Sequence, residues 1–428
     1  MNESTRAGVV CAAITPRPPA LDRWLRAQLL ARLSGLQHGR VVLEDPFGRL
    51  LLGQSDGHST EHDVSVGVLD AAFYRAVAAN GSVGAGAAYM DGLWRCSDLV
   101  GLLRLLVRNR AHLDGLESGL ARVGGRVLRA WHAFRRNTLA GAAKNIAAHY
   151  DLGNDFFGLF LSPDLMYSSA LWEGEGDTLE AASARKLERI CQKLDLRPGD
   201  HVCEIGSGWG GFAFHAAEKY GCRVTTITIS SQQHALVSRQ IQERGLGDRV
   251  QVLLKDYRML VGQYDKVVSI EMIEAVGAAY LETYFAALAR LAKPGGRVLI
   301  QAITIEDHRY AQALAGVDFI KRYIFPGSFI PSVQAMLTAK MRACDLSLLH
   351  LEDFGDSYAR TLREWRRRFL ARASQVHALG FDERFIRMWE YYMAYCEAGF
   401  QERSIGVAHL VFEKPRIAQV ARNASATS

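Results

Sequence analysis

The chain has 428 residues, enough for two or three domains with a sizeable buried core. Hydrophobic residues make up 49% and charged residues 22%, a globular balance that excludes a fibrous or wholly disordered protein. The net charge is +6, and all of the excess lies in the first 145 residues, which hold 18 basic and 12 acidic residues. The seven cysteines form no CxxC pair, so we expect reduced cytosolic thiols and no metal site.

The first 120 residues predict a small mixed, mainly helical domain. Helical patterns at 21–36 and 98–113 flank a Val/Leu-rich run at 41–52, which predicts a pair of strands. The Gly/Ala-rich stretch at 81–88 predicts a loop. We assign residues 1–120 to an N-terminal lipid-binding or accessory domain.

Residues 101–145 are strongly basic, with nine basic and two acidic residues. Leucines lie opposite the arginines, a pattern typical of an amphipathic helix whose charge suits an anionic partner such as a membrane surface. A solvated helix face, or arginines that bridge two domains or subunits, would explain the same pattern. We assign residues 121–145 to a basic linker.

From residue 186 onward the pattern changes to a repeat of strand, turn and helix. Strands are expected at 201–205, 223–229, 250–255, 265–270 and 297–303. Alternating strands and helices predict an α/β fold with a doubly wound, mostly parallel sheet of the Rossmann-like kind. We assign residues 146–420 to this domain.

A glycine-rich loop follows the first of these strands. Glycines there permit a tight turn and the close approach of a ligand to a helix N-terminus. Gly206, Gly208 and Gly211 satisfy GxGxxG, so a nicotinamide dinucleotide has to be considered. That cofactor requires an acid about 20 residues later, but the second strand ends in Thr228–Gln233, which contains no acid.

S-adenosylmethionine is the cofactor that fits better. Glu204 ends the first strand, Asp256 follows the third, and Lys293–Gly296 precedes the fifth, an order that suits this cofactor. Asp256 can accept a hydrogen bond from the adenine amine, and Tyr257 can cover the adenine face. Taken singly, Glu204 could instead cap a helix, and Lys293–Gly296 could be a helix stop.

Seven sequence blocks in order carry a family resemblance. They are His149–Phe157, Tyr167–Trp172, Glu204–Gly211, Ile227–Gln233, Glu271–Gly277, Asp318–Gly327 and Tyr391–Phe400. Together they resemble the cyclopropane fatty acid synthase family, including the mycolic acid cyclopropane synthases. The resemblance implies a class I methyltransferase fold and transfer of the methyl group of S-adenosylmethionine to an alkene in an acyl chain.

The resemblance also implies which residues bind the cofactor. Tyr167 and Ser168 would hold its methionine end, and Tyr257 would contact the adenine. The remaining cofactor-binding candidates are Glu204, Gly206, Gly208 and Gly210 at the glycine loop, Thr228, Ile229 and Gln233 on the ribose side, and Asp256.

The family reaction leaves a carbocation that must be shielded from water and deprotonated. Family members do this with a bound bicarbonate, held by a Cys, a Glu, a His, a Tyr and a main-chain group. The corresponding positions here are Ser169, Glu274, Gln301, Tyr358 and the main chain of Ile303. Because the Cys and the His are replaced, the base is either bicarbonate or Glu274 itself, if burial raises the pKa of this carboxyl. Glu274 could also be only a buried helix cap.

Apolar and aromatic walls suit a carbocation. The candidate substrate residues are Phe319, Tyr323, Phe325, Trp389, Tyr392 and Tyr395, each of which could equally be ordinary core. We expect an acyl-binding insertion around residues 305–345, within which the apolar segment 324–331 dips into the membrane.

We therefore expect an enzyme that converts unsaturated acyl chains of membrane phospholipid to cyclopropane chains. The same cation could instead give a methylene- or methyl-branched product, and a soluble small molecule or non-catalytic lipid binding are further alternatives. We expect S-adenosylmethionine as cofactor, with bicarbonate as a candidate second ligand. The expected location is the cytoplasm, peripheral at the inner face of the membrane. The expected partner is a phospholipid surface, and no nucleic acid partner is expected. A homodimer is a further possibility.

Overall fold

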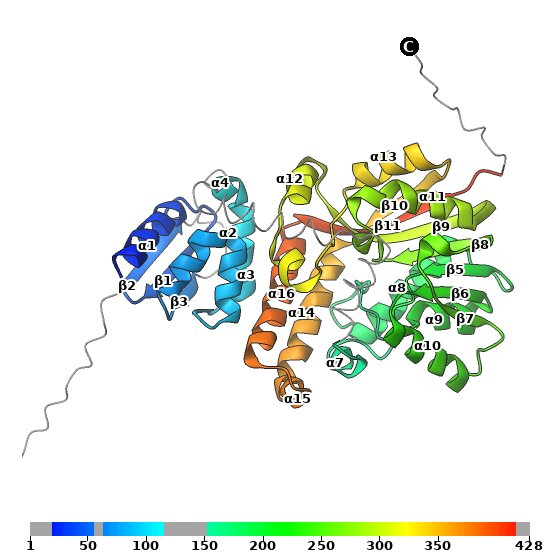
Figure 1. Ribbon diagram of the computed structural model, residues 1–428, viewed down its shortest axis with the longest axis horizontal. Helices are drawn as coiled ribbons and strands as arrows, with labels where there is room; N and C mark the ends of the chain where they lie inside the picture. Colours follow the sequence, from blue (N-terminus) through cyan, green and yellow to red (C-terminus); the bar gives the residue numbers. More distant parts are fainter. Residues whose placement is uncertain (1–18, 55–62, 115–151, 417–428) are drawn as a thin grey trace, which may run out of the picture.

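The computed structural model describes residues 19–54, 63–114 and 152–416, which form a small N-terminal domain packed against a larger α/β domain (Figure 1). The six cysteines within these ranges are free thiols. No helix in the same ranges is long and apolar enough to cross a membrane. The basic linker predicted at 121–145 lies outside the described residues.

The N-terminal domain is a four-stranded sheet, in the order β2-β1-β3-β4, packed against helices. Its elements are α1 (Ala20–Leu33), β1 (Gly39–Asp45), β2 (Gly48–Gln54), β3 (Val64–Val68), α2 (Ala72–Met90), β4 (Trp94–Cys96), α3 (Leu99–Arg108) and α4 (Arg110–Asp114). The predicted strand pair is confirmed by the antiparallel pairing of β1 and β2. Val41 and Leu43 alternate with more exposed residues and face the domain core, as the period of a strand requires.

The loop predicted at 81–88 is wrong, because these residues belong to α2. Gly81, at φ 56° and ψ −130°, breaks α2 into two helical segments. A Cβ atom at Gly84 would lie 1.9 Å from the carbonyl oxygen of Ala76, and one at Gly86 would lie 2.4 Å from the ring of Phe319 in the other domain. The glycines therefore permit a helix break and close packing, which their composition alone does not distinguish from a loop.

The larger domain contains a seven-stranded sheet in the order β10-β11-β9-β8-β5-β6-β7. Its strands are β5 (His201–Ile205), β6 (Arg223–Thr228), β7 (Val250–Leu254), β8 (Tyr264–Ile270), β9 (Ala292–Ile305), β10 (Ser347–Asp353) and β11 (Ile405–Glu413). Strands β5 to β9 pair in parallel, which confirms the predicted doubly wound sheet. The antiparallel strands β10 and β11 were not predicted.

Helices cover both faces of this sheet. The helices of the larger domain are α7 (Asn154–Gly158), α8 (Leu179–Leu194), α9 (Gly211–Tyr220), α10 (Ser231–Glu243), η1 (Tyr257–Met259), η2 (Ile273–Ala275), η3 (Ala278–Tyr280), α11 (Leu281–Leu291), η4 (Asp307–Arg309), α12 (Tyr310–Ala315), the π-helix η5 (Ile320–Ile324), α13 (Val333–Ala343), α14 (Gly355–Ala371), α15 (Ala373–Ala378) and α16 (Glu383–Gln401). Val202 packs with α8, α9 and α10 on one face, whereas its neighbour Cys203 packs with α11 and α13 on the other. Successive strand residues point to opposite faces, so both faces must be apolar.

The apolar segment 324–331 is not an exposed membrane-dipping loop. Ile324 and Phe329 are only 4% exposed, and the Phe329 N–H donates to the carbonyl oxygen of Glu274 at 3.1 Å. This segment packs inward beside the ends of β8 and β9, so its apolar residues contribute to the interior instead of a protein surface.

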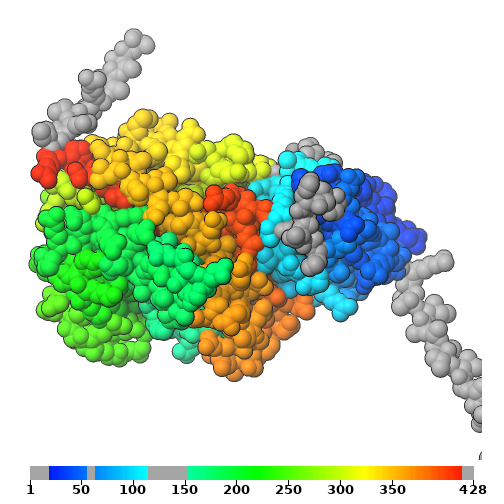
Figure 2. Space-filling view, turned by 180° about the vertical axis from the view of Figure 1, so that it is seen from behind, coloured from blue at the N-terminus to red at the C-terminus, as the bar shows by residue number. Residues whose placement is uncertain are grey.

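The two domains meet where α2 and α3 pack on α16 (Figure 2). Arg104 Nε donates to Glu402 at 2.7 Å, and Arg108 Nε donates to the same carboxylate at 2.9 Å. These two arginines of the basic segment therefore bridge the domains, as the alternative interpretation held, and do not form a membrane-binding face. The linker arginines Arg122 and Arg126 lie outside the described residues.

We predict that Glu402→Gln lowers the free energy of unfolding by about 1–3 kcal/mol, because two arginines lose a shared, charged acceptor at 14% exposure. Urea unfolding measures this loss. The control Asp356→Asn removes an ion pair with Arg403 whose side chains are 75% and 74% exposed, so its cost is at most about 1 kcal/mol. Equal losses for the two variants would contradict a structural role for the domain bridge.

Candidate active site

The glycine loop lies between the end of β5 and the start of α9. Gly206, at φ 96°, turns the chain, and its N–H and that of Ser207 donate to the carbonyl oxygen of Ile227 on β6. A Cβ atom at Gly211 would lie 2.5 Å from the sulfur of Met166, so only glycine allows α9 to begin so close to the preceding segment. The loop is thereby held as a concave edge at the carboxyl ends of β5 and β6, the position where such sheets bind ligands.

The predicted ribose-side residues lie at the end of β6. Thr228 Oγ1 donates to Gln233 Oε1 at 2.8 Å, and the N–H of Ser230 donates to Thr228 Oγ1 at 3.0 Å. Ser230 also caps α10 by accepting from the Gln233 N–H. These contacts place Thr228, Ile229 and Gln233 together on the cavity wall beside the glycine loop.

Asp256 and Tyr257 line the next part of the wall. Asp256 accepts from the Arg258 side chain at 2.8 and 2.7 Å and from its N–H at 2.9 Å. Burial opposes ionisation of Asp256, but these hydrogen bonds and the charge of Arg258 lower its pKa overall. The sequence predicted Asp256 as an acceptor for the adenine amine but missed Arg258, which donates to both of its oxygens.

A buried lysine supports the predicted methionine-end residues. Lys186 Nζ donates to Ser168 Oγ at 2.9 Å, and burial lowers the pKa of Lys186 to about 8 against the opposing effect of nearby carboxylates. Tyr167 and Tyr392 share a hydrogen bond of 3.0 Å between their hydroxyls. Sequence reasoning missed Lys186, since a single lysine in a helical pattern gives no functional signal.

Glu204 is the penultimate residue of β5, and burial raises the pKa of its carboxyl to about 8. Within the described part of the chain, its Oε2 atom has no hydrogen-bond partner. A buried acceptor that faces the cavity without a partner requires a donor from a ligand. With the concave glycine loop and the polar groups of Thr228 and Gln233, Glu204 fits S-adenosylmethionine, which has amino and hydroxyl donors.

The residues predicted to hold bicarbonate come together, but around a carboxylate that was not predicted. Glu271 Oε1 accepts from the Ser169 N–H at 2.9 Å and from Gln301 Nε2 at 2.7 Å. Its Oε2 accepts from the Tyr358 hydroxyl at 2.6 Å. The glutamate follows β8 directly and has φ 49°, an uncommon conformation for a residue with a side chain.

Glu274 lies one turn beyond Glu271. Its Oε1 accepts from the Ile303 N–H at 2.6 Å, whereas within the described residues its Oε2 has no partner. Burial raises the pKa of Glu274 to about 8, and the charge of Glu271 adds to this rise, so Glu274 is largely protonated at neutral pH. The raised pKa that the sequence interpretation required for Glu274 is therefore present.

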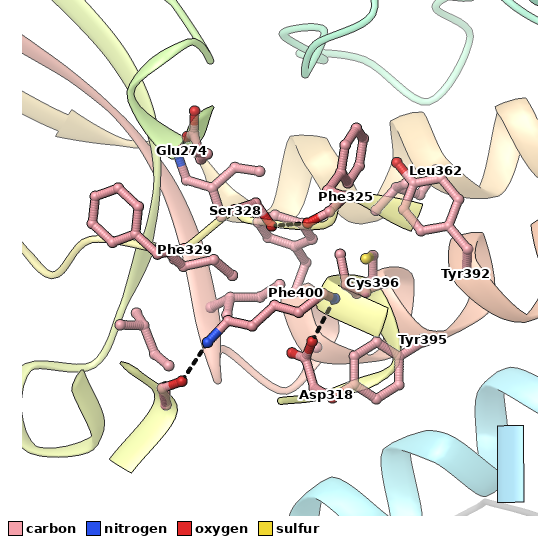
Figure 3. Close-up of a pocket in the computed structure, with 18 of the residues that line it drawn as sticks. Glu274, Asp318, Phe325, Ser328, Phe329, Leu362, Tyr392, Tyr395, Cys396 and Phe400 are labelled. Carbon is pink, nitrogen blue, oxygen red and sulfur yellow. Dashed lines mark hydrogen bonds between the residues drawn. The ribbon is translucent and has the colours of Figure 1, made fainter. Parts of the chain in front are cut away.

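A single cavity of about 960 Å³ joins these groups to the interior of the N-terminal domain. It extends from the glycine loop past Glu271 and Glu274, along η5 and α16, to residues of the N-terminal core. These core residues are Leu33, Leu43, Val66, Val77, Trp94 and Leu102. Figure 3 shows the middle section, where Glu274 lies at one end and Tyr395, Cys396 and Asp318 lie toward the helices of the N-terminal domain.

The predicted substrate residues divide into two groups. Phe325, Tyr392 and Tyr395 line the cavity, but Phe319, Tyr323 and Trp389 are not on its wall. Trp389 is fully buried in a cluster of phenylalanines that includes Phe156 and Phe369. Phe319 packs on Tyr391 and Tyr323 between the domains. Sequence alone did not separate wall from core, because both kinds of position are aromatic.

Two of the other predicted residues support the site from behind. Ser169 and Gln301 are fully buried and reach the cavity only through Glu271. Gly210 is the residue before α9 and does not line the cavity.

Comparison with known proteins gives a consistent family. The family model described as mycolic acid cyclopropane synthetase matches residues 137–410. The tuberculostearic acid methyltransferase UfaA1 of Mycobacterium tuberculosis is 39% identical over 344 residues, covering 78% of this chain and 80% of the relative. The cyclopropane-fatty-acyl-phospholipid synthase of Escherichia coli is 37% identical over 350 residues, covering 80% and 86%.

Solved structures give the same result. The cyclopropane synthase MmaA2 from Mycobacterium tuberculosis is 28% identical, with a TM-score of 0.60, and covers 64% of this chain and 98% of its own. Mycolic acid cyclopropane synthase CmaA1, complexed with SAH and CTAB, is 29% identical with the same TM-score and the same coverage.

We predict that Glu274→Gln changes how folding stability depends on pH. A carboxyl whose pKa is raised to about 8 by folding stabilises the protein fully at low pH, and this contribution is lost as pH rises from the unfolded value of about 4.3 to about 8. Glutamine cannot ionise, so the stability of the variant relative to the wild type should increase as pH rises through that interval.

Urea unfolding at pH 5, 7 and 9 measures this difference. Glu175→Gln, the same substitution at an exposed position, is the matched control. A constant difference between wild type and Glu274→Gln would mean that Glu274 is already ionised at pH 5.

Proposed function

Because the chain belongs to the mycolic acid cyclopropane synthetase family, we propose that it methylates the double bond of an unsaturated acyl chain of membrane phospholipid. It is an S-adenosylmethionine-dependent methyltransferase of the cyclopropane fatty acid synthase type. When bound, the cofactor supplies an electrophilic methyl group on a sulfonium. The protein must then bind the alkene, exclude water and accept a proton.

The observation that carries this proposal is the continuous apolar cavity between the glycine loop and the N-terminal core. Burial of about a dozen acyl methylenes at roughly 0.8 kcal/mol each contributes on the order of 10 kcal/mol, enough to compete with a bilayer. The volume of about 960 Å³ suits a cofactor together with part of an acyl chain. A lipid-binding role for the N-terminal domain follows from the same cavity.

The aromatic wall supports the chemistry. Phe325, Tyr392 and Phe400 surround the middle of the cavity near Glu274 (Figure 3). Ring faces stabilise a carbocation by their electron-rich quadrupole and do not react with it as water would. We propose Tyr167, Ser168, Glu204, Gly206 and Thr228 among the cofactor-binding residues, since all of them line the adjoining wall.

We propose a cyclopropane product, formed when the cation loses a proton and closes a ring. A methylene product from the same cation is the second candidate, and the 39% identity to a tuberculostearic acid methyltransferase favours including it. A saturated methyl branch would require an additional hydride donor. A phospholipid substrate requires a peripheral position at a membrane surface, and we propose the cytoplasmic inner face.

The purified protein should add one labelled methyl carbon from S-adenosylmethionine to vesicles of unsaturated phospholipid. Vesicles of saturated phospholipid should remain unlabelled, since they have no alkene. Mass spectrometry before and after catalytic hydrogenation distinguishes the products, because an exocyclic alkene takes up hydrogen readily whereas a ring resists it. Equal labelling of both vesicles, or labelling of soluble compounds alone, would contradict the proposal.

A second experiment tests the N-terminal part of the cavity. Val77 lines this part, so Val77→Trp should fill the space that a long acyl chain needs. If the indole displaces two methylenes of the acyl chain, the lost burial of about 0.8 kcal/mol for each should lower the methylation rate on long chains by roughly tenfold. The affinity for the cofactor should not change. Leu69→Trp, at a 56% exposed position of the same domain, is the control. Unchanged rates for Val77→Trp would show that the chain does not enter this domain.

A further inference from the structure

We propose that the side-chain carboxylate of Glu271 is the base of the methyl-transfer reaction and takes the place of a bound bicarbonate. The catalytic part of this inference rests on the proposed function, whereas the exclusion of bicarbonate can be measured without it.

Three hydrogen-bond donors surround the side chain of Glu271. Ser169, Gln301 and Tyr358 come from a loop, from β9 and from α14, and each donates to this one carboxylate at 2.6 to 2.9 Å. These are three of the residues that the family resemblance would place around a bicarbonate. Because both carboxylate oxygens are already engaged by them, a second anion at the same atoms would lose those donors and meet a like charge.

The orientation of Gln301 is fixed by a chain of hydrogen bonds. Lys193 Nζ lies 3.0 Å from Nδ1 of His409, and His409 Nε2 lies 3.0 Å from Gln301 Oε1. An ammonium has only donors, so Nδ1 accepts and Nε2 carries the ring proton. His409 therefore donates to the Gln301 oxygen, and the Gln301 amide nitrogen must face Glu271.

The neutral state of His409 completes this chain. Burial, with the charge of Lys193, holds the pKa of His409 well below its usual value, so the ring stays neutral. A neutral donor behind Gln301 makes the amide a fixed donor toward Glu271.

The backbone of Glu271 has an uncommon conformation. Its φ of 49° lies in the left-handed region, which costs on the order of 1 kcal/mol or more for a residue with a side chain. The Glu271 N–H donates to the Gln301 carbonyl oxygen at 2.8 Å, which holds the residue in this conformation at the end of β8. Strained residues cluster at functional sites, and this strain places the carboxylate on the cavity wall.

The two neighbouring glutamates then have different states. Burial raises the pKa of Glu271, but hydrogen bonds on both carboxylate oxygens and the nearby ammonium of Lys186 oppose this rise by stabilising the ionised form. Glu274 receives one hydrogen bond from Ile303 and the repulsion of Glu271, so it keeps its proton at neutral pH. Of the two carboxyl groups, Glu271 is the one able to accept a proton.

The alkene π electrons form the new bond to the methyl carbon while the carbon–sulfur bonding pair returns to sulfur, leaving a cation on the other alkene carbon. A C–H bond of the transferred methyl then breaks, and its electron pair forms the third bond of the ring. The proton goes to the Glu271 carboxylate, which becomes a neutral carboxyl and must release the proton to water before the next turnover.

The test uses Glu271→Gln and Glu271→Gly in the full-length protein. Glutamine keeps the shape but cannot accept the proton, so single-turnover methylation should fall by about 100- to 10,000-fold while cofactor binding by calorimetry is retained. Glycine relieves the left-handed strain and vacates the donors, so this variant should fold and should regain at least about tenfold in rate with added bicarbonate or formate. Glu175→Gln, exposed and remote, is the control for preparation effects.

Bicarbonate calorimetry without cofactor or lipid gives an independent measurement. Wild type should show no binding, and Glu271→Gly should bind bicarbonate. The inference is overturned if wild type binds bicarbonate and slows when it is removed, or if Glu271→Gln methylates within about twofold of wild type. If wild type methylates no unsaturated lipid, the proposed function fails, and the calorimetry still decides whether Glu271 occupies the anion site.

Discussion

Buried charge is the constraint that arranges the reaction centre. Lys186 and Glu204 are buried near the carboxyl ends of the central strands, and the half-buried Glu271 and Glu274 line the cavity wall there. Each ionised group there must be compensated by an opposite charge or by hydrogen-bond donors. Hydrogen bonds to these carboxyl groups therefore hold β9 and α14 in position. The cavity wall that these elements form is held in the same way.

Two glutamates three residues apart show how strongly position decides chemistry. Glu271 and Glu274 belong to one short segment after β8, yet one has donors on both oxygens and the other on one. The difference comes from what faces each side chain, because β9 presents an amide to the first and a backbone N–H to the second. A pair of carboxyl groups with separate states can hold a proton and accept one in the same cavity.

Much of the sheet was predictable from sequence, because local signals there agree with the fold. The five parallel strands lie where alternating strand and helix patterns placed them, with β5 matching at both ends and β9 beginning earlier. Strands β10 and β11 were missed because they follow long helices and pair antiparallel at the edge, without the strand-turn-helix rhythm. The 81–88 segment was taken for a loop because close helix packing and loops both use glycine.

The site was predictable as a set of positions but not as a geometry. The family resemblance named Ser169, Gln301 and Tyr358 as neighbours of one anion, and the structure places all three within hydrogen-bonding distance of the Glu271 carboxylate. Glu271 was overlooked, although it is the first residue of one of the seven family blocks. It also contacts Ser169 and Gln301, the two positions that depart from the family pattern. Its role depends on a left-handed backbone and on donors from distant segments, neither of which is written in local sequence.

Helix α16 joins the two domains mechanically. On one side of this helix, Tyr391 packs against Tyr89 of the N-terminal domain, and Glu390 accepts a hydrogen bond from the Tyr89 hydroxyl at 2.8 Å. The neighbouring Tyr392 shares a hydrogen bond with Tyr167, which lies on the cavity wall beside the glycine loop. A rotation of α16 about its axis would move both sets of contacts together. Substitutions at the domain seam, remote from the glycine loop, would therefore change the shape of the cavity, and under the proposed function they would offer a route to new chain-length selectivity that leaves Glu271 and Glu274 unchanged.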